Sequence, residues 1–288
     1  MAIQHEKFLR LDRRKFLGVA AGLIAAGVLP KSVLALAGPY SFKQGSYDIT
    51  IVSDGTLTLP LAVVSPDATP EEIKALVGAM AEGDKFRAQL NAVLAKSAND
   101  TILIDTGVGA GYQETSGKLA ENLKAAGIDP GTITKVIYTH GHPDHLWGTA
   151  GADGVPIFPN ASFHVAEAEW NFWTAPDLAS KMPKEMTEMV KGIQGEYAAI
   201  KDKVTFFKPG AELVSGLAAI DTAGHTPGHV SFEFAGGDGL IVTGDAIIQP
   251  TVFLAHPDWK FGFDADGATA SVNRRKLLDQ AAAGKKTM

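Results

Sequence analysis

Three histidines and an aspartate fall within the six residues 140–145, although the whole chain has only eight histidines. Imidazole and carboxylate groups together suit zinc, manganese, iron or cobalt. The side chains of His140 and His142 can face the same way only on an extended or coiled segment, because strand side chains repeat every second residue. The β-branched and aromatic run 133–138 therefore predicts a buried strand that delivers the cluster into a loop. Pro143 excludes a helix that continues through the middle of the cluster.

The alternative is a group of solvated or core histidines without a metal. It is disfavoured, because burying that many unpaired imidazoles would be costly. Two later segments also repeat the design of the first. Residues 219–229 fit a strand followed by a Gly-Pro loop with His225 and His229, and residues 241–245 fit a strand that ends in Gly-Asp. Because polar residues that follow separate buried strands can converge on one open site, we expect these loops to meet the first cluster.

An earlier strand, 101–107, ends in Asp105 and a glycine-rich turn, and it is expected to pair with the alternating segment 90–98. Asp105 could be a metal ligand, but an acceptor that orients a metal-bound histidine is the preferred interpretation. The glycines of the turn do not form a dinucleotide fingerprint, because the helix and the ribose-binding acid expected after it are not evident. Residues 117–127 then predict a short amphipathic helix closed by glycine.

A strand over 161–165 and a helix start over 166–173 follow the cluster. Helical spacing puts Trp170 and Trp173 on one face. Core packing is the preferred interpretation of this aromatic face, and the apolar wall of a substrate pocket is the alternative. His164 falls inside the strand, so we expect a structural role for it.

Residues 1–37 predict an export signal. Twin arginines precede an uncharged stretch rich in Gly and Ala, and an Ala-Leu-Ala sequence stands directly before Gly38 as a cleavage site. The uncharged stretch, 17–29, is shorter than the roughly 20 residues that a bilayer crossing requires, so an uncleaved membrane anchor is the less favoured alternative. We therefore expect export to the periplasm by the twin-arginine route, no stable membrane span after cleavage, and one catalytic domain over residues 38–288.

Charge and cysteine content narrow the possible partners and ligands. The signal holds six basic and two acidic residues, so the domain keeps 20 basic and 30 acidic residues and a net charge near −10. Because a phosphate backbone requires a basic surface, we expect no nucleic-acid partner. The chain has no cysteine. A zinc site must therefore use histidine and carboxylate ligands, and no disulfide can stabilise the exported domain.

The order of these motifs resembles that of one family. The motifs are His140-x-His142-x-Asp144-His145, Gly224-His225-Thr-Pro-Gly-His229 and Thr243-Gly244-Asp245. Together they are similar to the metallo-β-lactamase superfamily of metal-dependent hydrolases, and within it to methyl parathion hydrolases and quorum-quenching lactonases. Ser53-Asp54-Gly55, Asp105-Thr106-Gly107 and Glu169–Trp173 extend the likeness over nearly all of the mature chain. The resemblance implies an α/β fold of the αββα sandwich type.

The resemblance also implies a role for each motif residue. One divalent ion would be held by His140, His142 and His225, a second by Asp144 and His145, and Asp245 would bridge the two. His229 matches a motif histidine that is not a ligand, and Trp173 matches an aromatic residue of a substrate pocket.

The implied activity is hydrolysis. Two divalent ions, zinc before manganese, iron or cobalt, would provide a metal-bound hydroxide that attacks the carbonyl or phosphorus of a small ester, lactone or organophosphate. Asp144 would accept or shuttle a proton, and Asp245 would hold both ions in place. A homodimer is a further open expectation.

One departure from the family concerns the second ion. The family has a further histidine on a strand after its last long helix, which we expect here over 268–283 with Gly284 as the C-cap. Only four residues follow Gly284, so the C-terminal strand and its histidine are missing from the sequence. His256 is a poor substitute, since it precedes the helix. A truncated sequence is preferred here over a naturally shortened chain, because a sheet position is left unfilled.

Two rival functions stay open. The missing ligand suits an exported metal-binding protein with an incomplete second site and little activity, and a thioesterase of the glyoxalase II type is also compatible with the motifs. β-Lactamase activity is disfavoured. Its subclasses with a cysteine ligand are excluded by composition, and the remaining subclass does not rely on a bridging residue such as Asp245.

Overall fold

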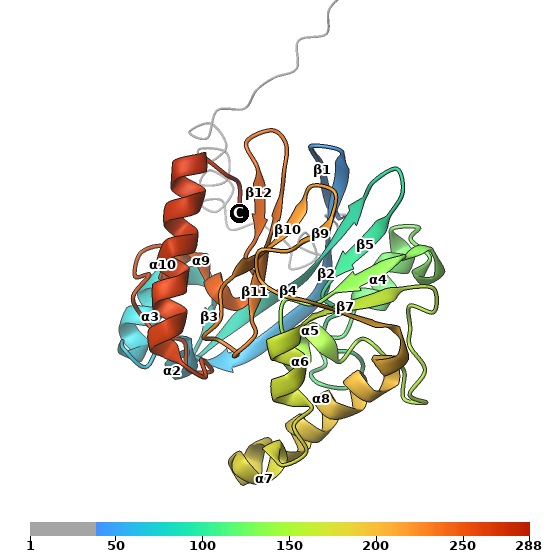
Figure 1. Ribbon diagram of the computed structural model, residues 1–288. Helices are drawn as coiled ribbons and strands as arrows, with labels where there is room; N and C mark the ends of the chain where they lie inside the picture. The colour runs from blue at the N-terminus through green and yellow to red at the C-terminus, as the bar shows by residue number, and fades with distance from the viewer. Residues whose placement is uncertain (1–38) are drawn as a thin grey trace, which may run out of the picture. The chain divides into compact units, whose positions relative to one another are not determined.

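A computed structural model describes residues 39–288, which form two stacked β-sheets with helices on both outer sides (Figure 1). The expected export signal and its cleavage junction lie outside the described residues. One hydrophobic core fills the space between the two sheets. Each sheet also has a core on its outer side, between the sheet and the helices that cover it. The layer order of helix, sheet, sheet and helix confirms the predicted αββα sandwich.

The larger sheet has the strand order β1-β2-β4-β5-β6-β7-β8, with β3 paired to β4. The pairs up to β5 are antiparallel, whereas β5 to β8 run parallel. Its strands are β1 (Tyr40–Gln44), β2 (Tyr47–Pro60), β3 (Ala81–Glu82), β4 (Lys85–Lys96), β5 (Thr101–Ile104), β6 (Lys135–Ile137), β7 (Ser162–Ala166) and β8 (Val204–Phe207). The strand predicted over 133–138 is therefore β6, which is shorter than expected.

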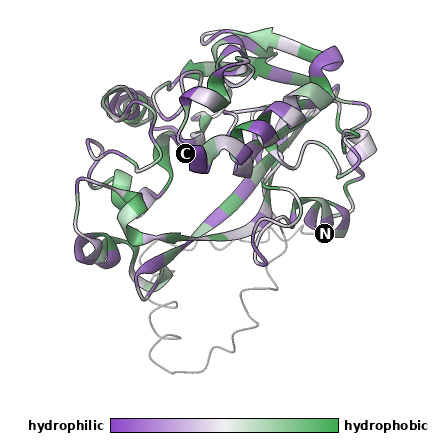
Figure 2. Cartoon of the chain, turned by 90° about the horizontal axis from the view of Figure 1, so that it is seen from below, coloured by the Kyte–Doolittle hydropathy of each residue, from purple (hydrophilic) through white to green (hydrophobic). Residues whose placement is uncertain are grey.

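The smaller sheet is antiparallel and has the strand order β12-β11-β10-β9. Its strands are β9 (Glu212–Val214), β10 (Leu217–Asp221), β11 (Val230–Phe234) and β12 (Leu240–Val242). Alternation along the strands decides which core each side chain joins. Ile102 and Ile104 of β5 pack toward the smaller sheet, whereas Leu103 packs toward the helices. Figure 2 shows the corresponding alternation of hydrophobic and hydrophilic residues along the long strands.

The helices outside the larger sheet include α4 and α8, which bury Leu123 and Ile193 against it. This group consists of α4 (Leu119–Ala125), η3 (Pro130–Thr132), α5 (Pro143–Leu146), α6 (Glu167–Trp173), α7 (Leu178–Lys181), η4 (Lys184–Met186), α8 (Thr187–Ile200) and η5 (Lys201–Lys203). The short helix predicted over 117–127 is α4.

The other outer layer contains α10, whose buried Leu277 packs in a core with Phe253 and Ile73. This group consists of α2 (Leu61–Val64), α3 (Pro70–Val77), η2 (Gly78–Met80), η6 (Gly244–Ile247), α9 (Pro250–Phe253) and α10 (Gly267–Gly284). Gly284, expected as the C-cap, is still helical, and Lys285 takes the left-handed cap position instead. Within residues 39–288, no helix has the length and apolarity that a membrane crossing needs.

The residues after α10 lie beside β12. Thr287 forms an isolated parallel bridge with Leu240. Its N–H donates to the carbonyl of Gly239 at 3.0 Å, and its carbonyl accepts from the N–H of Ile241 at 2.8 Å. The chain therefore reaches the edge of the smaller sheet next to the strand that precedes η6.

Candidate metal centre

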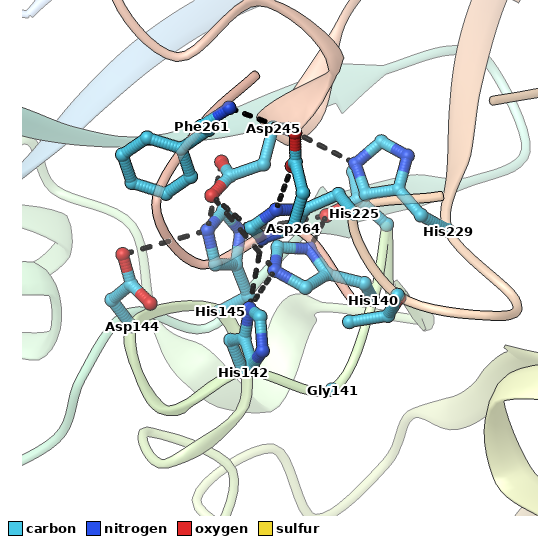
Figure 3. A network of polar contacts seen from close by, with 12 residues as sticks. His140, Gly141, His142, Asp144, His145, His225, His229, Asp245, Phe261 and Asp264 are labelled. Atoms are coloured by element: carbon cyan, nitrogen blue, oxygen red, sulfur yellow. Dashed lines mark hydrogen bonds and ion pairs between the residues drawn. The ribbon is translucent and has the colours of Figure 1, made fainter. Parts of the chain in front are cut away.

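The segments that follow three strands, β6, β10 and β12, bring the predicted ligands together (Figure 3). The loop after β6 carries His140 and His142, and the helix α5 that follows it carries Asp144 and His145. The loop after β10 carries His225, and the helix η6 after β12 carries Asp245. Each loop leaves the carboxyl end of a buried strand, which is the arrangement that the sequence predicted.

The first cluster changes conformation at Pro143. His142 is extended, with φ −68° and ψ 158°, and it caps the helix α5 that begins at Pro143. Proline is tolerated at the first helical position because the N–H it lacks has no intrahelical acceptor there. No helix continues through Pro143 from the preceding residues, as predicted, but the proline itself starts a short helix that was not predicted. The turn carries Asp144 and His145 on α5, and the ring of His145 lies 4.1 Å from that of His140 between centroids.

Three imidazole nitrogens converge in a first group. His142 Nδ1 lies 3.0 Å from His140 Nε2 and 2.8 Å from His225 Nε2. Two nitrogen ligands of a tetrahedral zinc ion lie about 3.3 Å apart at the usual bond length. The three nitrogens thus come close to the spacing of ligands around one cation.

Asp245 divides its two oxygens between this group and a second one. Its Oδ2 lies 3.3 Å from His225 Nε2 and 3.9 Å from His140 Nε2. Its Oδ1 lies 3.2 Å from His145 Nε2, and Asp144 Oδ2 is 3.6 Å from the same nitrogen. Ligand atoms of His140, His145 and Asp245 also lie within 4.8 Å of one another, whereas Asp144 reaches this set only through His145. We call Asp144, His145 and Asp245 the second group, and it shares Asp245 with the first.

Carboxylates stand behind two of the imidazoles. Asp105 Oδ2 is 2.8 Å from His145 Nδ1, and Asp264 Oδ1 is 3.0 Å from His225 Nδ1. A carboxylate at Nδ1 favours the tautomer that keeps the proton there, and the Nε2 lone pair is then free to face a cation. The donor set therefore fits divalent cations of the zinc type, with one near His140, His142 and His225 and another near Asp144 and His145.

Asp105 takes the orienting position rather than a place among the converging ligand atoms. Both of its oxygens accept from Thr139, one from the N–H and the other from the hydroxyl, each at 2.8 Å. Its backbone is left-handed, with φ 63°. Such a conformation is uncommon for residues other than glycine, and it clusters at functional sites.

Both ring nitrogens of His229 are occupied by hydrogen-bond partners. Nδ1 lies 2.8 Å from the hydroxyl of Thr222, and Nε2 accepts the backbone N–H of Asp245 at 3.0 Å. His229 thus holds Asp245 in place, and neither of its nitrogens is free to bind a cation. This position fits the role without direct ligation that the resemblance implied.

Burial and charge act in opposite directions at the histidines. Burial, reinforced by the neighbouring histidines, lowers the pKa of His140 and His142 well below the usual range. Burial also acts to lower the pKa of His145 and His225, but nearby carboxylates, Asp245 above all, outweigh it. They raise the pKa of His145 well above the usual range and that of His225 to about 9. The site therefore attracts positive charge.

The remaining predicted residues lie at different distances from the centre. Trp173 is buried, and its ring lies edge-on to that of His142 with the centroids 5.6 Å apart. It belongs to the core and also lines the cleft above the histidines, so both interpretations of this residue describe its position. His164 is buried in β7 beside Ser162. His256 stacks on Trp259 and belongs to neither ligand group.

Two residues that support the centre were not recognised from the sequence as part of the site. Asp264 contacts His225, and Glu169 accepts hydrogen bonds from both histidine loops. An isolated acid in a loop or at the first turn of a helix has no sequence signal for such a role. In the sequence, the Glu169–Trp173 segment stands out only as part of the family likeness.

A cleft of about 1230 Å³ opens over both groups. Polar groups at its floor include Asp144, His145 and Asp245. Nearby wall residues are apolar or aromatic, and they include Tyr112, Phe172, Trp173, Met182, Met186, Met189, Phe261 and Phe263. The centre is therefore accessible to a small molecule with an apolar part.

The chain matches the family model of the metallo-beta-lactamase superfamily over residues 87–288. It belongs to that superfamily. The match starts in β4 and includes every candidate ligand, so it agrees with the resemblance of the motifs.

Two solved structures share the fold over most of their length. AidC, a dizinc quorum-quenching lactonase, has a TM-score of 0.79 and 29% identity, over 87% of this chain and 89% of AidC. The hydrolase AbOPH of the β-lactamase superfamily has a TM-score of 0.79 and 30% identity, over 87% of this chain and 88% of AbOPH.

The likeness to curated sequences is shorter. The N-acyl homoserine lactonase AttM of Agrobacterium fabrum is 29% identical over 137 residues, which are 44% of this chain and 46% of AttM. The chain spans 61% or less of the length of the first curated relatives that it matches.

Proposed function

We propose that this chain is a metal-dependent hydrolase that cleaves an ester, a lactone or a phosphotriester at a centre of two divalent cations. The observation that carries the proposal is the position of Asp245, whose Oδ2 faces His225 at 3.3 Å while its Oδ1 faces His145 at 3.2 Å. One carboxylate shared by two adjacent ligand groups at the floor of an open cleft is suited to a pair of cations. Membership of the superfamily and the likeness to AidC and AbOPH support hydrolysis.

Bound cations would lower the pKa of a water molecule toward neutrality and polarise a substrate oxygen. The protein residues orient the reactants around them. Asp105 and Asp264 fix the tautomers of His145 and His225. Asp144 lines the cleft with a quarter of its side chain exposed, so its carboxylate can receive a proton at Oδ2 and pass it to a leaving group.

The wall residues favour a substrate with an apolar arm. Phe172, Trp173 and three methionines line the cleft beside the ligands. Methionine side chains are flexible and polarisable, and they adapt to ligands of different shape. An acyl chain or an aryl group could therefore lie along this wall while its ester, lactone or phosphoryl group reaches the centre.

An assay panel tests this function. The protein would be loaded separately with zinc, manganese and cobalt and given acyl-homoserine lactones, aryl esters, thioesters and methyl parathion, with D245N as the control. We expect metal-dependent turnover of at least one oxygen ester, lactone or phosphotriester, and a marked loss of turnover in D245N. Turnover of thioesters alone would favour a glyoxalase II-like activity. Metal binding without any turnover would favour the metal-binding protein.

Export to the periplasm is a separate proposal. It is supported by the twin-arginine pattern and the Ala-Leu-Ala sequence before Gly38. Cell fractionation followed by N-terminal sequencing is the test. Replacement of both arginines by lysine should keep the protein in the cytoplasm, and a mature N-terminus far from Gly38 would contradict the predicted cleavage site.

A further inference from the structure

The carboxylate of Glu169 is enclosed between the two loops that carry the histidines of the first group. Glu169 lies in the first turn of α6 and is 1% exposed. Its Oε1 accepts from the N–H of Gly141 at 2.7 Å and from the indole N–H of Trp173 at 2.6 Å. Its Oε2 accepts from the hydroxyl of Thr226 at 2.7 Å and from the N–H of Gly228 at 2.9 Å.

These four donors come from three segments: the loop after β6, the loop after β10 and the helix α6. Gly141 stands between His140 and His142, and Thr226 directly follows His225. One side chain thus joins the loops that supply all three histidines of the first group, although the loops lie more than eighty residues apart in the sequence. The fourth donor, Trp173, lies edge-on to His142.

The contact between α6 and the two loops is too close for a side chain at Gly141 or Gly228. A Cβ on Gly141 would lie 2.6 Å from Cδ1 of Trp173, and a Cβ on Gly228 would lie 2.2 Å from the backbone nitrogen of Glu169. Glycine at both positions therefore lets the two backbone N–H groups reach the carboxylate. Because the loops meet α6 this closely, a shift of the carboxylate would be transmitted to the neighbouring imidazoles.

The second ligand group is held in another way. His145 is oriented by Asp105, and Asp144 and His145 lie on α5, whereas all four donors to Glu169 lie outside α5. We infer that Glu169 is a positioning residue that sets the spacing of His140, His142 and His225, and thereby the affinity of the first group for its cation. This inference rests on the proposed two-cation centre and goes beyond it by assigning one cation to the control of Glu169.

The substitution E169Q keeps the size of the side chain and tests its acceptor function. All four partners use an N–H or O–H as the donor, so an amide NH₂ group would face donors in either orientation. It would oppose the N–H groups of Gly141 and Trp173, or else the N–H of Gly228 while the Thr226 hydroxyl turns to accept. At least one loop therefore loses its backbone hydrogen bond to this side chain.

Cobalt titration of the metal-free protein, with chelator competition and visible absorption, measures each affinity. Residues that hold metal ligands in place typically change metal affinity by about 10- to 100-fold. We expect E169Q to weaken one cation by this factor, to change the other less than threefold, and to alter the cobalt spectrum of the weakened ion. A comparison of D144A with the double variant D144A/E169Q assigns the effect, because D144A damages only the second group.

The control is E167Q on the same helix, where the Glu167 carboxylate is half exposed and lies 3.3 Å from Lys208 Nζ. It should leave both affinities unchanged. If E169Q does not fold, T226V removes one of the four donors and should weaken the same cation by a smaller factor.

Equal affinities in the parent and E169Q, or equal weakening of both cations, would overturn the inference and leave the proposed function in place. A parent protein that binds no cation would overturn both.

Discussion

The substitution D264N tests whether the carboxylate behind His225 controls cation affinity. Asp264 Oδ1 lies 3.0 Å from His225 Nδ1, and Oδ2 accepts the backbone N–H of Phe261 at 2.9 Å. Both side chains of the Asp264–His225 pair are at most 2% exposed, so water screens their interaction little. Arg274 Nη2 lies 3.8 Å from Asp264 Oδ2 and partly balances its charge.

The expected magnitude follows from this hydrogen bond. A hydrogen bond to a charged group contributes about 1.5–3 kcal/mol. The asparagine keeps one oxygen acceptor, but its amide NH₂ must face either His225 or the N–H of Phe261. We therefore expect cation affinity to fall about 10- to 100-fold, which corresponds to roughly 1.4–2.8 kcal/mol. The metal-free variant should also unfold more easily, since Arg274 loses its buried counter-charge.

Chelator competition with zinc measures the affinity, and urea unfolding of the metal-free protein measures the stability. The matched control is D258N, because Asp258 pairs with Arg275 on the surface and is 72% exposed. D258N should leave zinc affinity unchanged. Unchanged affinity in a folded D264N protein would refute the claim that this carboxylate orients His225 for binding.

Three further predictions concern the proposed bridging ligand, the cleft wall and a partly buried acid. D245N should lower the metal content, measured by mass spectrometry, to one ion per chain or fewer, since both oxygens of Asp245 face ligand groups; two ions would contradict the bridging role. M186E should raise KM for apolar aryl esters about tenfold or more with little change in kcat, because it places a charge on the apolar wall; an unchanged KM would exclude this wall from binding. Burial raises the pKa of Glu196 from 4.5 to about 7. The protonated Glu196 therefore contributes stability that is fully present below pH 4.5 and lost as the pH rises through 7. At pH 8.5 the free energy of unfolding of E196Q should exceed that of the parent by about 1–2 kcal/mol, after allowance for partial exposure, and at pH 4 the two should be equal.

The sequence predicted the elements whose signal is local. Residues 133–138 and 219–221 became β6 and β10 because β-branched and apolar side chains suit strands that are buried in the sandwich. The candidate ligands were recognisable because imidazoles cluster in loops directly after such strands. Local signals were less precise at boundaries, as at Pro143, where one residue both ends an extended segment and starts a helix.

The supporting carboxylates could not be predicted in the same way. Glu169 has the sequence context of an ordinary acid in the first turn of a helix, and Asp264 that of an acid in a polar loop. Their partners in the histidine loops lie 28 to 59 residues away for Glu169 and 39 residues away at His225 for Asp264. Only the packing of α6 and of the segment before α10 against the histidine loops brings these groups together.

The carboxylates beside His225 also determine how the centre responds to pH. Asp264 and Asp245 lie 3.0 and 3.3 Å from its ring nitrogens in a largely buried site, and such a concentration of negative charge is costly unless positive charge joins it. In the metal-free protein that charge is a proton, which is why the pKa of His225 rises to about 9. A cation must displace such protons before it binds, so affinity should fall as pH is lowered. Because His145 and His225 hold their protons more tightly than ordinary imidazoles do, whereas His140 and His142 do not, the protons on His145 and His225 should make this loss begin above neutral pH rather than near pH 6.5.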